Sequence, residues 1–169
     1  MPETAQQYTQ RILSNAEGQD PVKLQAASAR KLERLIAGVS SAKLRKRPVA
    51  EKWSVAEILA HLADAELVIA WRLRSILGEP GVQVQAFDQN AWVAARKYNQ
   101  RDPRKSIELY SVVRKANLAL LKSLTPQQWK QFGQHSERGQ ESIEHIAHMV
   151  AGHDVNHIKQ IESILRPGK

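Results

Sequence analysis

The stretch ESIEHIAHMVAGHDVNHIKQIESIL, residues 141–165, predicts a long amphipathic helix and contains four of the six histidines of the chain. Apolar residues recur along it at helical spacing, and a rotation of about 100° per residue sorts the side chains by face. On that wheel His153 and His157 lie in the middle of the apolar stripe, whereas His145 and His148 point away from it. The helix is therefore expected to present one inward pair of histidines, at positions i and i+4.

Three further long helices are predicted upstream by the signals that start a helix. Two of them begin at an Asp-Pro pair, which supplies an N-cap followed by proline at the first helical position. The third begins at a capping box, in which Ser54 caps the backbone and Glu57 reaches back. The three helices are expected over residues 21–38, 55–77 and 103–124. Four long helices predict an all-α fold, an antiparallel four-helix bundle in which residues 1–169 form a single domain.

The connections between these helices contain weaker signals. Short extra helices are expected after Asp88 and at TPQQW, residues 125–129. The one clear period-two alternation, GVQVQAF at residues 81–87, has no second strand to pair with, so no sheet is expected. Gly152 inside the last helix costs about 1 kcal/mol relative to alanine, which suggests that it marks a close approach between helices.

Composition excludes several classes of protein. Hydrophobic residues make up 42% of the chain and charged residues 25%, values typical of a folded globular domain. No apolar run approaches the length of about 18–20 residues that crosses a bilayer, and the N-terminus lacks the apolar core of a secretory signal, so a cytoplasmic location is expected. The absence of cysteine excludes disulfides, thiolate nucleophiles and cysteine-type metal sites.

The net charge of +8 raises the question of nucleic-acid binding. The basic residues concentrate in two loop-like runs, residues 43–52 and 96–105. Neither run interleaves aromatic side chains or forms a recognition helix. Solvated loop charge is the preferred interpretation, and nucleic acid is not the expected partner.

Two histidines rarely hold a metal tightly, so a third ligand is needed. His61 is the natural candidate, because the helical wheel places it at the edge of the apolar face of the helix expected over residues 55–77. Histidines in a core are also often hydrogen-bonded without any metal, and this alternative stays open on pattern alone. His135 precedes the last helix with nothing to orient it, and is interpreted as a surface residue.

Two motifs point to a known family. KWSVAEILAHLADAE at residues 52–66 and HDVNHIKQI at residues 153–161 resemble the DinB-like superfamily, which includes S-transferases that use bacillithiol or mycothiol. The resemblance implies an up-down-down-up bundle with one divalent ion, zinc or nickel, held by His61, His153 and His157. Bundles of this family often pair through a helix face, so it also allows a homodimer, although no apolar stripe here is clearly surplus to the core.

A site with three neutral imidazoles leaves at least one coordination position open, as in catalytic zinc sites. We therefore expect a metal-dependent enzyme that acts on a small molecule, either an S-transferase that uses a low-molecular-weight thiol or a hydrolase. The alternative is a non-catalytic, metal-binding stress-response bundle.

Other polar residues near the predicted site are candidates for supporting roles. Hydrolysis needs a proton acceptor, for which the weak candidates are Glu57, Asp64 and Asp154, and Asp64 is more simply a residue that orients a ligand imidazole. Arg72 is a candidate to bind a substrate carboxylate. Asn156 and Gln160 are expected to hydrogen-bond either a ligand or a neighbouring helix.

Overall fold

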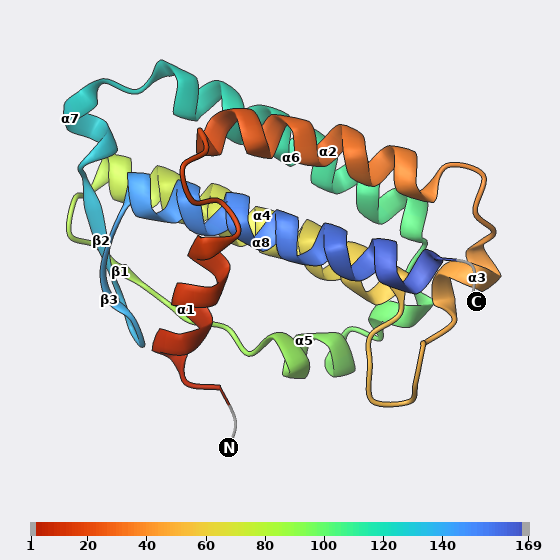
Figure 1. Ribbon diagram of the computed structural model, residues 1–169. Helices are drawn as coiled ribbons and strands as arrows, with labels where there is room; N and C mark the ends of the chain where they lie inside the picture. Colours follow the sequence, from red (N-terminus) through yellow and green to blue (C-terminus); the bar gives the residue numbers. More distant parts are fainter. Residues whose placement is uncertain (1–2, 167–169) are drawn as a thin grey trace.

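The computed structural model describes residues 3–166, and it is built around four long helices (Figure 1). They are α2 (Pro21–Ile36), α4 (Val55–Gly78), α6 (Pro103–Ser123) and α8 (Ile143–Leu165). In Figure 1, α2 and α8 run in one direction while α4 and α6 run in the other. The bundle and its up-down-down-up order are therefore confirmed, and each helix lies within two residues of its expected bounds.

Each bundle helix begins at a side chain that accepts hydrogen bonds from the backbone N–H groups of the first turn. These groups have no partner within the helix, so a capping oxygen stabilises the start. The expected capping box at Ser54 is present, with the Glu57 side chain accepting from the Ser54 backbone N–H at 2.8 Å. The other caps are Asp20, Asp102 and Ser142.

Shorter helices fill the connections. The two expected from sequence are α5 (Gln89–Ala95), which is capped by Asp88, and α7 (Pro126–Trp129). Three others were not expected: α1 (Ala5–Ser14), α3 (Ser41–Arg45) and the 3-10 helix η1 (Tyr98–Gln100). They are too short to be stable alone and depend on packing against the bundle.

The expectation that the chain contains no sheet was wrong. Three short strands, β1 (Gln83–Val84), β2 (Phe132–His135) and β3 (Gly139–Ser142), form a sheet in the order β1-β2-β3. β1 pairs with β2 in parallel, and β2 pairs with β3 as an antiparallel hairpin. The partner strands escape a pattern search because FGQH and GQES lack β-branched residues.

Helix α1 crosses α8 at Gly152. A Cβ atom at this position would lie 2.0 Å from the backbone oxygen of Ile12. The close approach expected at Gly152 is confirmed, although the partner is the unexpected α1 rather than another bundle helix.

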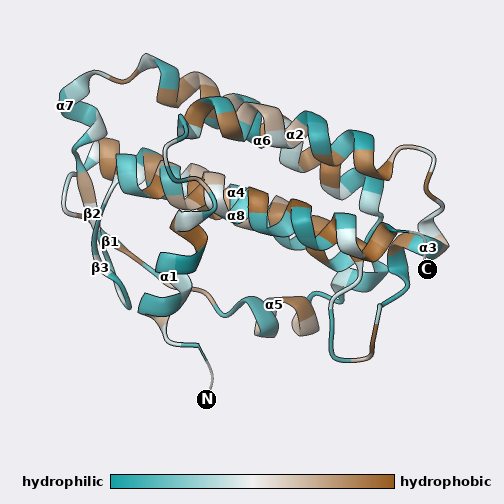
Figure 2. Ribbon diagram, in the orientation of Figure 1, coloured by the Kyte–Doolittle hydropathy of each residue, from teal (hydrophilic) through white to brown (hydrophobic). Residues whose placement is uncertain are grey.

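The bundle interior consists of two apolar clusters with polar side chains between them. One cluster, near α3, includes Leu32, Ile58 and Ile161, and the other, near the sheet, includes Leu73, Leu121 and Val150. Between them lie five buried residues that we call the polar layer: Gln25, Glu66, Arg114, Asn117 and Asp154. Stripes of hydrophobic and hydrophilic residues alternate along the bundle helices (Figure 2). Within residues 3–166, no helix combines the length and the apolar character needed to cross a membrane.

Candidate metal centre

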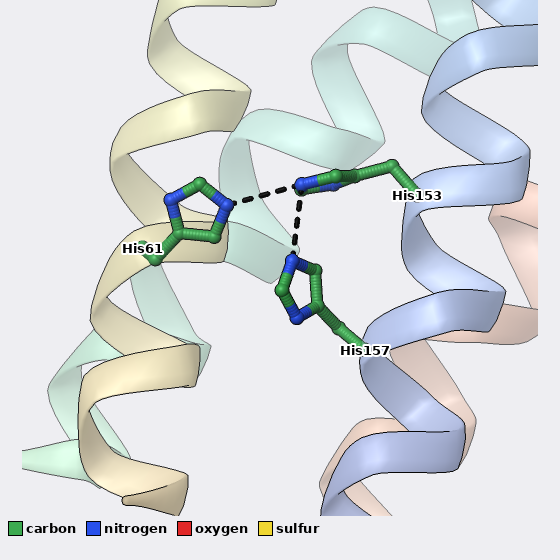
Figure 3. Close-up of side chains that lie close together, drawn as sticks. All are labelled: His61, His153 and His157. Carbon is green, nitrogen blue, oxygen red and sulfur yellow. Dashed lines mark hydrogen bonds between the residues drawn. The ribbon is translucent and has the colours of Figure 1, made fainter. Parts of the chain in front are cut away.

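Three histidine side chains meet between α4 and α8 (Figure 3). The Nε2 atom of His153 lies 3.0 Å from Nε2 of His61 and 3.1 Å from Nε2 of His157. One ring nitrogen from each residue falls within 4.8 Å of the others. The pair on α8 converges because residues four apart share one helix face. The structure therefore brings together the three residues selected from sequence.

Burial favours the neutral form of these imidazoles, and one hydrogen bond selects the tautomer of His157. Burial and the neighbouring His157 lower the pKa of His61 to about 3. Burial lowers the pKa of His157 to about 4, and that of His153 well below its ordinary value. The side-chain oxygen of Gln160 lies 3.0 Å from Nδ1 of His157. This contact places the proton on Nδ1, since the oxygen can only accept, and leaves Nε2 free to bind a cation.

The donor set fits a divalent ion. Tetrahedral ligands at about 2.0–2.1 Å from zinc lie roughly 3.3 Å from one another, close to the spacings around His153. Without a metal, one proton can form a hydrogen bond across only one of the two short nitrogen–nitrogen contacts. A cation between the rings would accept the lone pairs of all three nitrogens. Neutral nitrogen donors also suit zinc and other transition metals better than magnesium or calcium, which prefer oxygen.

A cavity of about 100 Å³, which we call the histidine cavity, opens beside His61 and His153. Three members of the polar layer line it: Glu66, Arg114 and Asp154. Aromatic side chains complete the lining, including Tyr8 from α1, Phe87 and Tyr110. A small molecule in this cavity would contact both the histidine cluster and the buried charges.

Arg114 connects all four bundle helices beside the cavity. Its guanidinium donates to both carboxylate oxygens of Glu66 on α4, at 2.8 and 2.7 Å, and to Asp154 on α8. It also donates to the backbone oxygen of Gln25 on α2 at 3.3 Å. Tyr110 donates its hydroxyl to Asp154 at 3.0 Å. Each charge in the layer thus has an oppositely charged partner, as burial requires.

The segment that carries the three histidines matches a known protein family. Residues 25–161, which include all three, match the model of the DinB superfamily. The chain belongs to the DinB superfamily. The resemblance inferred from the two motifs is therefore confirmed.

Two curated relatives of this DinB protein carry provisional names as metal-dependent hydrolases. YfiT of Bacillus subtilis is 27% identical over 68% of this chain and 65% of its own length. A protein of Oceanobacillus iheyensis is 26% identical over 68% of this chain and 66% of its own length. The matched segment spans just under two thirds of the length of these relatives.

Solved structures show the same fold as this DinB protein. The structure of YfiT from Bacillus subtilis, described as an unusual four-helix bundle topology, has a TM-score of 0.76 and 22% identity, covering 85% of this chain and 84% of that one. A mycothiol-dependent maleylpyruvate isomerase has a TM-score of 0.69 and 11% identity, covering 83% of this chain and 59% of that one. At these identities the likeness concerns the fold alone.

The two carboxylates considered first as proton acceptors are engaged elsewhere in this DinB protein. Glu57 forms the capping box and pairs with Arg47. One oxygen of Asp64, Oδ2, accepts from Tyr98 at 2.6 Å and from Arg101 at 2.9 Å. Neither carboxylate has a hydrogen bond to a cluster histidine within residues 3–166. Their catalytic roles stay predictions without a supporting contact.

The three candidate substrate-binding residues lie in different parts of the structure and have different partners. Gln160 bonds His157 within the cluster. The side-chain oxygen of Asn156 accepts from Arg11 of α1 at 3.0 Å, which makes Asn156 a helix-to-helix contact. Arg72 is buried behind the sheet, where it donates to the backbone oxygen of Gln85. Roles in substrate binding stay predictions for all three.

The interpretation of His135 as a surface residue was wrong. Its side chain is buried, because the unexpected strand β2 carries it into the space between the sheet and α4. There it lies 3.3 Å from Arg72. His145 and His148 lie outside the cluster, as expected, and are half-buried rather than exposed.

Sequence reasoning missed Arg114 and Glu66, which form a deeply buried ion pair beside the cavity. A signal was present on α6, where Arg114 and Asn117 share a stripe with Tyr110 and Leu121 at helical spacing, all of them buried. A cation in line with core residues needs a buried anion. Which carboxylate supplies it depends on how α4 and α8 pack against α6.

Proposed function

We propose that this protein is a metal-dependent hydrolase of a small molecule, with one divalent ion held by His61, His153 and His157. The observation that carries the proposal is the convergence of three Nε2 atoms at 3.0 and 3.1 Å beside a cavity. The provisional names of the curated relatives give independent support. Zinc and nickel are the proposed metals, because both suit imidazole donors.

A divalent ion at this site would supply a polarised water or polarise a substrate oxygen. Neighbouring residues orient the histidine side chains that would bind this ion. Gln160 fixes the tautomer of His157. The ring of Trp53 packs against that of His61, with 5.2 Å between the ring centroids. The aromatic lining of the histidine cavity excludes water from the apolar part of a bound substrate.

A second candidate, thiol transfer, is favoured by one specific observation. The carboxylates that line the histidine cavity, Glu66 and Asp154, are both bound by Arg114. Their oxygens are already engaged in ion pairs with Arg114, whereas a thiolate activated on a metal needs no protein base. A low-molecular-weight thiol would then be the cosubstrate.

Metal analysis tests the site itself. The purified protein should contain about one divalent ion per chain, and His153→Ala should lose most of it, since two imidazoles bind weakly. His148→Ala, on the same helix but outside the cluster, serves as the matched control and should keep its metal. Equal metal content in the His153 variant and the control would refute the site.

Activity assays distinguish the two reactions. A panel of esters and amides should detect metal-dependent hydrolysis that His153→Ala abolishes. A parallel panel should combine low-molecular-weight thiols with electrophilic acceptors. Turnover only in the thiol panel would replace the hydrolase proposal with the transferase.

Chelation addresses the non-catalytic alternative. Two apolar clusters and the polar layer hold the bundle independently of the histidines. We therefore expect the chelated protein to keep its helical circular dichroism, with only a modest fall in melting temperature. Unfolding on chelation would indicate a structural metal instead.

A further inference from the structure

Arg72 is a buried cation without an anionic partner. Its side chain projects from α4 and the residue is only 5% exposed. None of the ion pairs formed within residues 3–166 includes it, and its guanidinium bonds only the backbone oxygen of Gln85 and faces His135. A buried guanidinium loses its hydration and is costly unless an anion pairs with it. Arg114, by contrast, pairs with two carboxylates.

His135 presents a second donor at the same point. Its Nδ1 atom accepts from the backbone N–H groups of Glu137 at 3.2 Å and Arg138 at 3.3 Å. The proton of the neutral ring must therefore be on Nε2, which lies 3.3 Å from the Nη2 atom of Arg72. Two donors thus face each other, which is unfavourable unless an acceptor binds to both.

Both donors line a cavity of about 640 Å³, which we call the Arg72 pocket. The acidic residues along it, Glu3, Asp88 and Glu137, are exposed. Glu3 is already paired with Arg11, and Asp88 caps α5. The acidic residues that line the pocket therefore lie at its solvent side, and the buried carboxylate nearby, Glu141, is already bound by Arg138.

The Arg72 pocket adjoins the histidine cavity. Tyr8, Phe87, Gln89 and Arg138 line both. The Phe87 ring is held against Trp92 with a centroid distance of 4.7 Å. A molecule that extends past Phe87 can thus reach the histidine cluster with one end and Arg72 with the other.

We propose that Arg72 and His135 form a binding site for a carboxylate group of the small molecule that occupies the histidine cavity. A carboxylate fits because its two oxygens accept one hydrogen bond from each donor and its charge pairs with the guanidinium. The proposal rests on the proposed function, because it identifies the second end of the same substrate. The substrate class is an organic acid with its reactive group several bonds from the carboxylate.

Calorimetric titration with succinate tests the site, with neutral succinamide as the control compound. The full-length protein is titrated both zinc-loaded and after chelation. Succinate should bind in both states and succinamide in neither. Arg72→Gln and His135→Gln should each weaken succinate binding by at least about tenfold. The matched control Arg30→Gln, which removes the same charge from an exposed position on α2, should leave binding unchanged.

A measurement on the wild-type protein covers the case in which the buried variants do not fold. Succinate should shift the Nε2 resonance of His135 in nitrogen NMR spectra, at a concentration that matches the calorimetric titration. Any one of three results would overturn the proposal. They are an unchanged affinity of Arg72→Gln for succinate, an Nε2 resonance of His135 that succinate does not shift, and loss of succinate binding on chelation alone. Failure of the metal site would show in the metal content of His153→Ala, and leaves this titration on chelated protein interpretable.

Discussion

At the scale of single residues, the geometry of the histidine cluster depends on Gln160, which is not one of the proposed metal ligands. Gln160 accepts the Nδ1 proton of His157, so the lone pair on Nε2 faces the other two imidazoles. Carboxylates often play this part beside metal-binding histidines. Here Asp154 and the Oδ2 atom of Asp64 bind arginines instead.

Gln160→Leu should lower the affinity for the divalent ion by about 10- to 100-fold, because it removes the hydrogen bond that orients a ligand. The measurement is competition for zinc with a chelator of known affinity. Lys159→Ala, which changes an exposed neighbour on α8, is the control and should bind zinc as the wild type does. Equal affinity in the two variants would show that Gln160 does not position His157.

Gly152→Ala should destabilise the protein by about 1–3 kcal/mol, since overpacking forces the backbones of α8 and α1 apart. The added methyl would lie 2.0 Å from the Ile12 oxygen. The free energy of unfolding in urea measures the effect. Gly78→Ala, where nothing lies within 4 Å of the new atom, should be neutral or slightly stabilising. Equal stability of the two variants would contradict the close contact.

At the scale of elements, the N-terminal half of α4 binds the basic segments that precede and follow it in the chain. Arg47 pairs with Glu57, and Arg96 and Arg101 both pair with Asp64. Arg45 donates to the backbone oxygen of Asn99 at 3.1 Å. Part of the positive charge in the two basic runs thus has an internal role, and the expectation about nucleic acid stays a prediction.

Glu57→Gln should reduce stability in a pH-dependent way. Burial raises the pKa of Glu57, but hydrogen bonds from Arg47 and Ser54 outweigh burial and hold the pKa below its ordinary value. The ionised carboxylate therefore stabilises the fold above the unfolded pKa of about 4.3, and the contribution is lost as the pH falls through the folded pKa.

The melting temperature of Glu57→Gln should lie roughly 2–4 °C below that of the wild type at neutral pH. The difference should shrink as the pH falls below about 4. Glu51→Gln, an exposed change in the same connection, should show no difference at either pH. If the difference in melting temperature between Glu57→Gln and the wild type stays constant across this pH range, the ionised Glu57 carboxylate does not contribute to stability.

At the scale of the whole molecule, the polar layer joins the four bundle helices through one arginine. Arg114→Met should cost about 3–5 kcal/mol of unfolding free energy, because Glu66 and Asp154 are left buried without a cation. Denaturation in urea measures it. Lys115→Met, at the adjacent exposed position, is the control and should change little. A cost below about 1 kcal/mol would mean that the layer does not hold the bundle together.

Much of this architecture could be predicted from local signals. Asp-Pro starts and a capping box predicted three of the long helices, and 3.6-residue periodicity predicted the fourth and separated His153 and His157 from His145 and His148. The sheet could not be predicted, since two four-residue polar strands form only once they are paired. The burial of His135 follows from that pairing, so it escaped prediction as well.

The sequence by itself determined the four bundle helices, their boundaries to within two residues, and which histidines of the last helix face inward, because caps and helical periodicity act within one element. The tertiary structure decided which carboxylate meets Arg114, that α1 packs on Gly152, and that β2 brings His135 to Arg72. These contacts join residues that are 48, 140 and 63 positions apart, respectively. Only the packing of separate elements brings such residues together, so no local pattern in the chain specifies them.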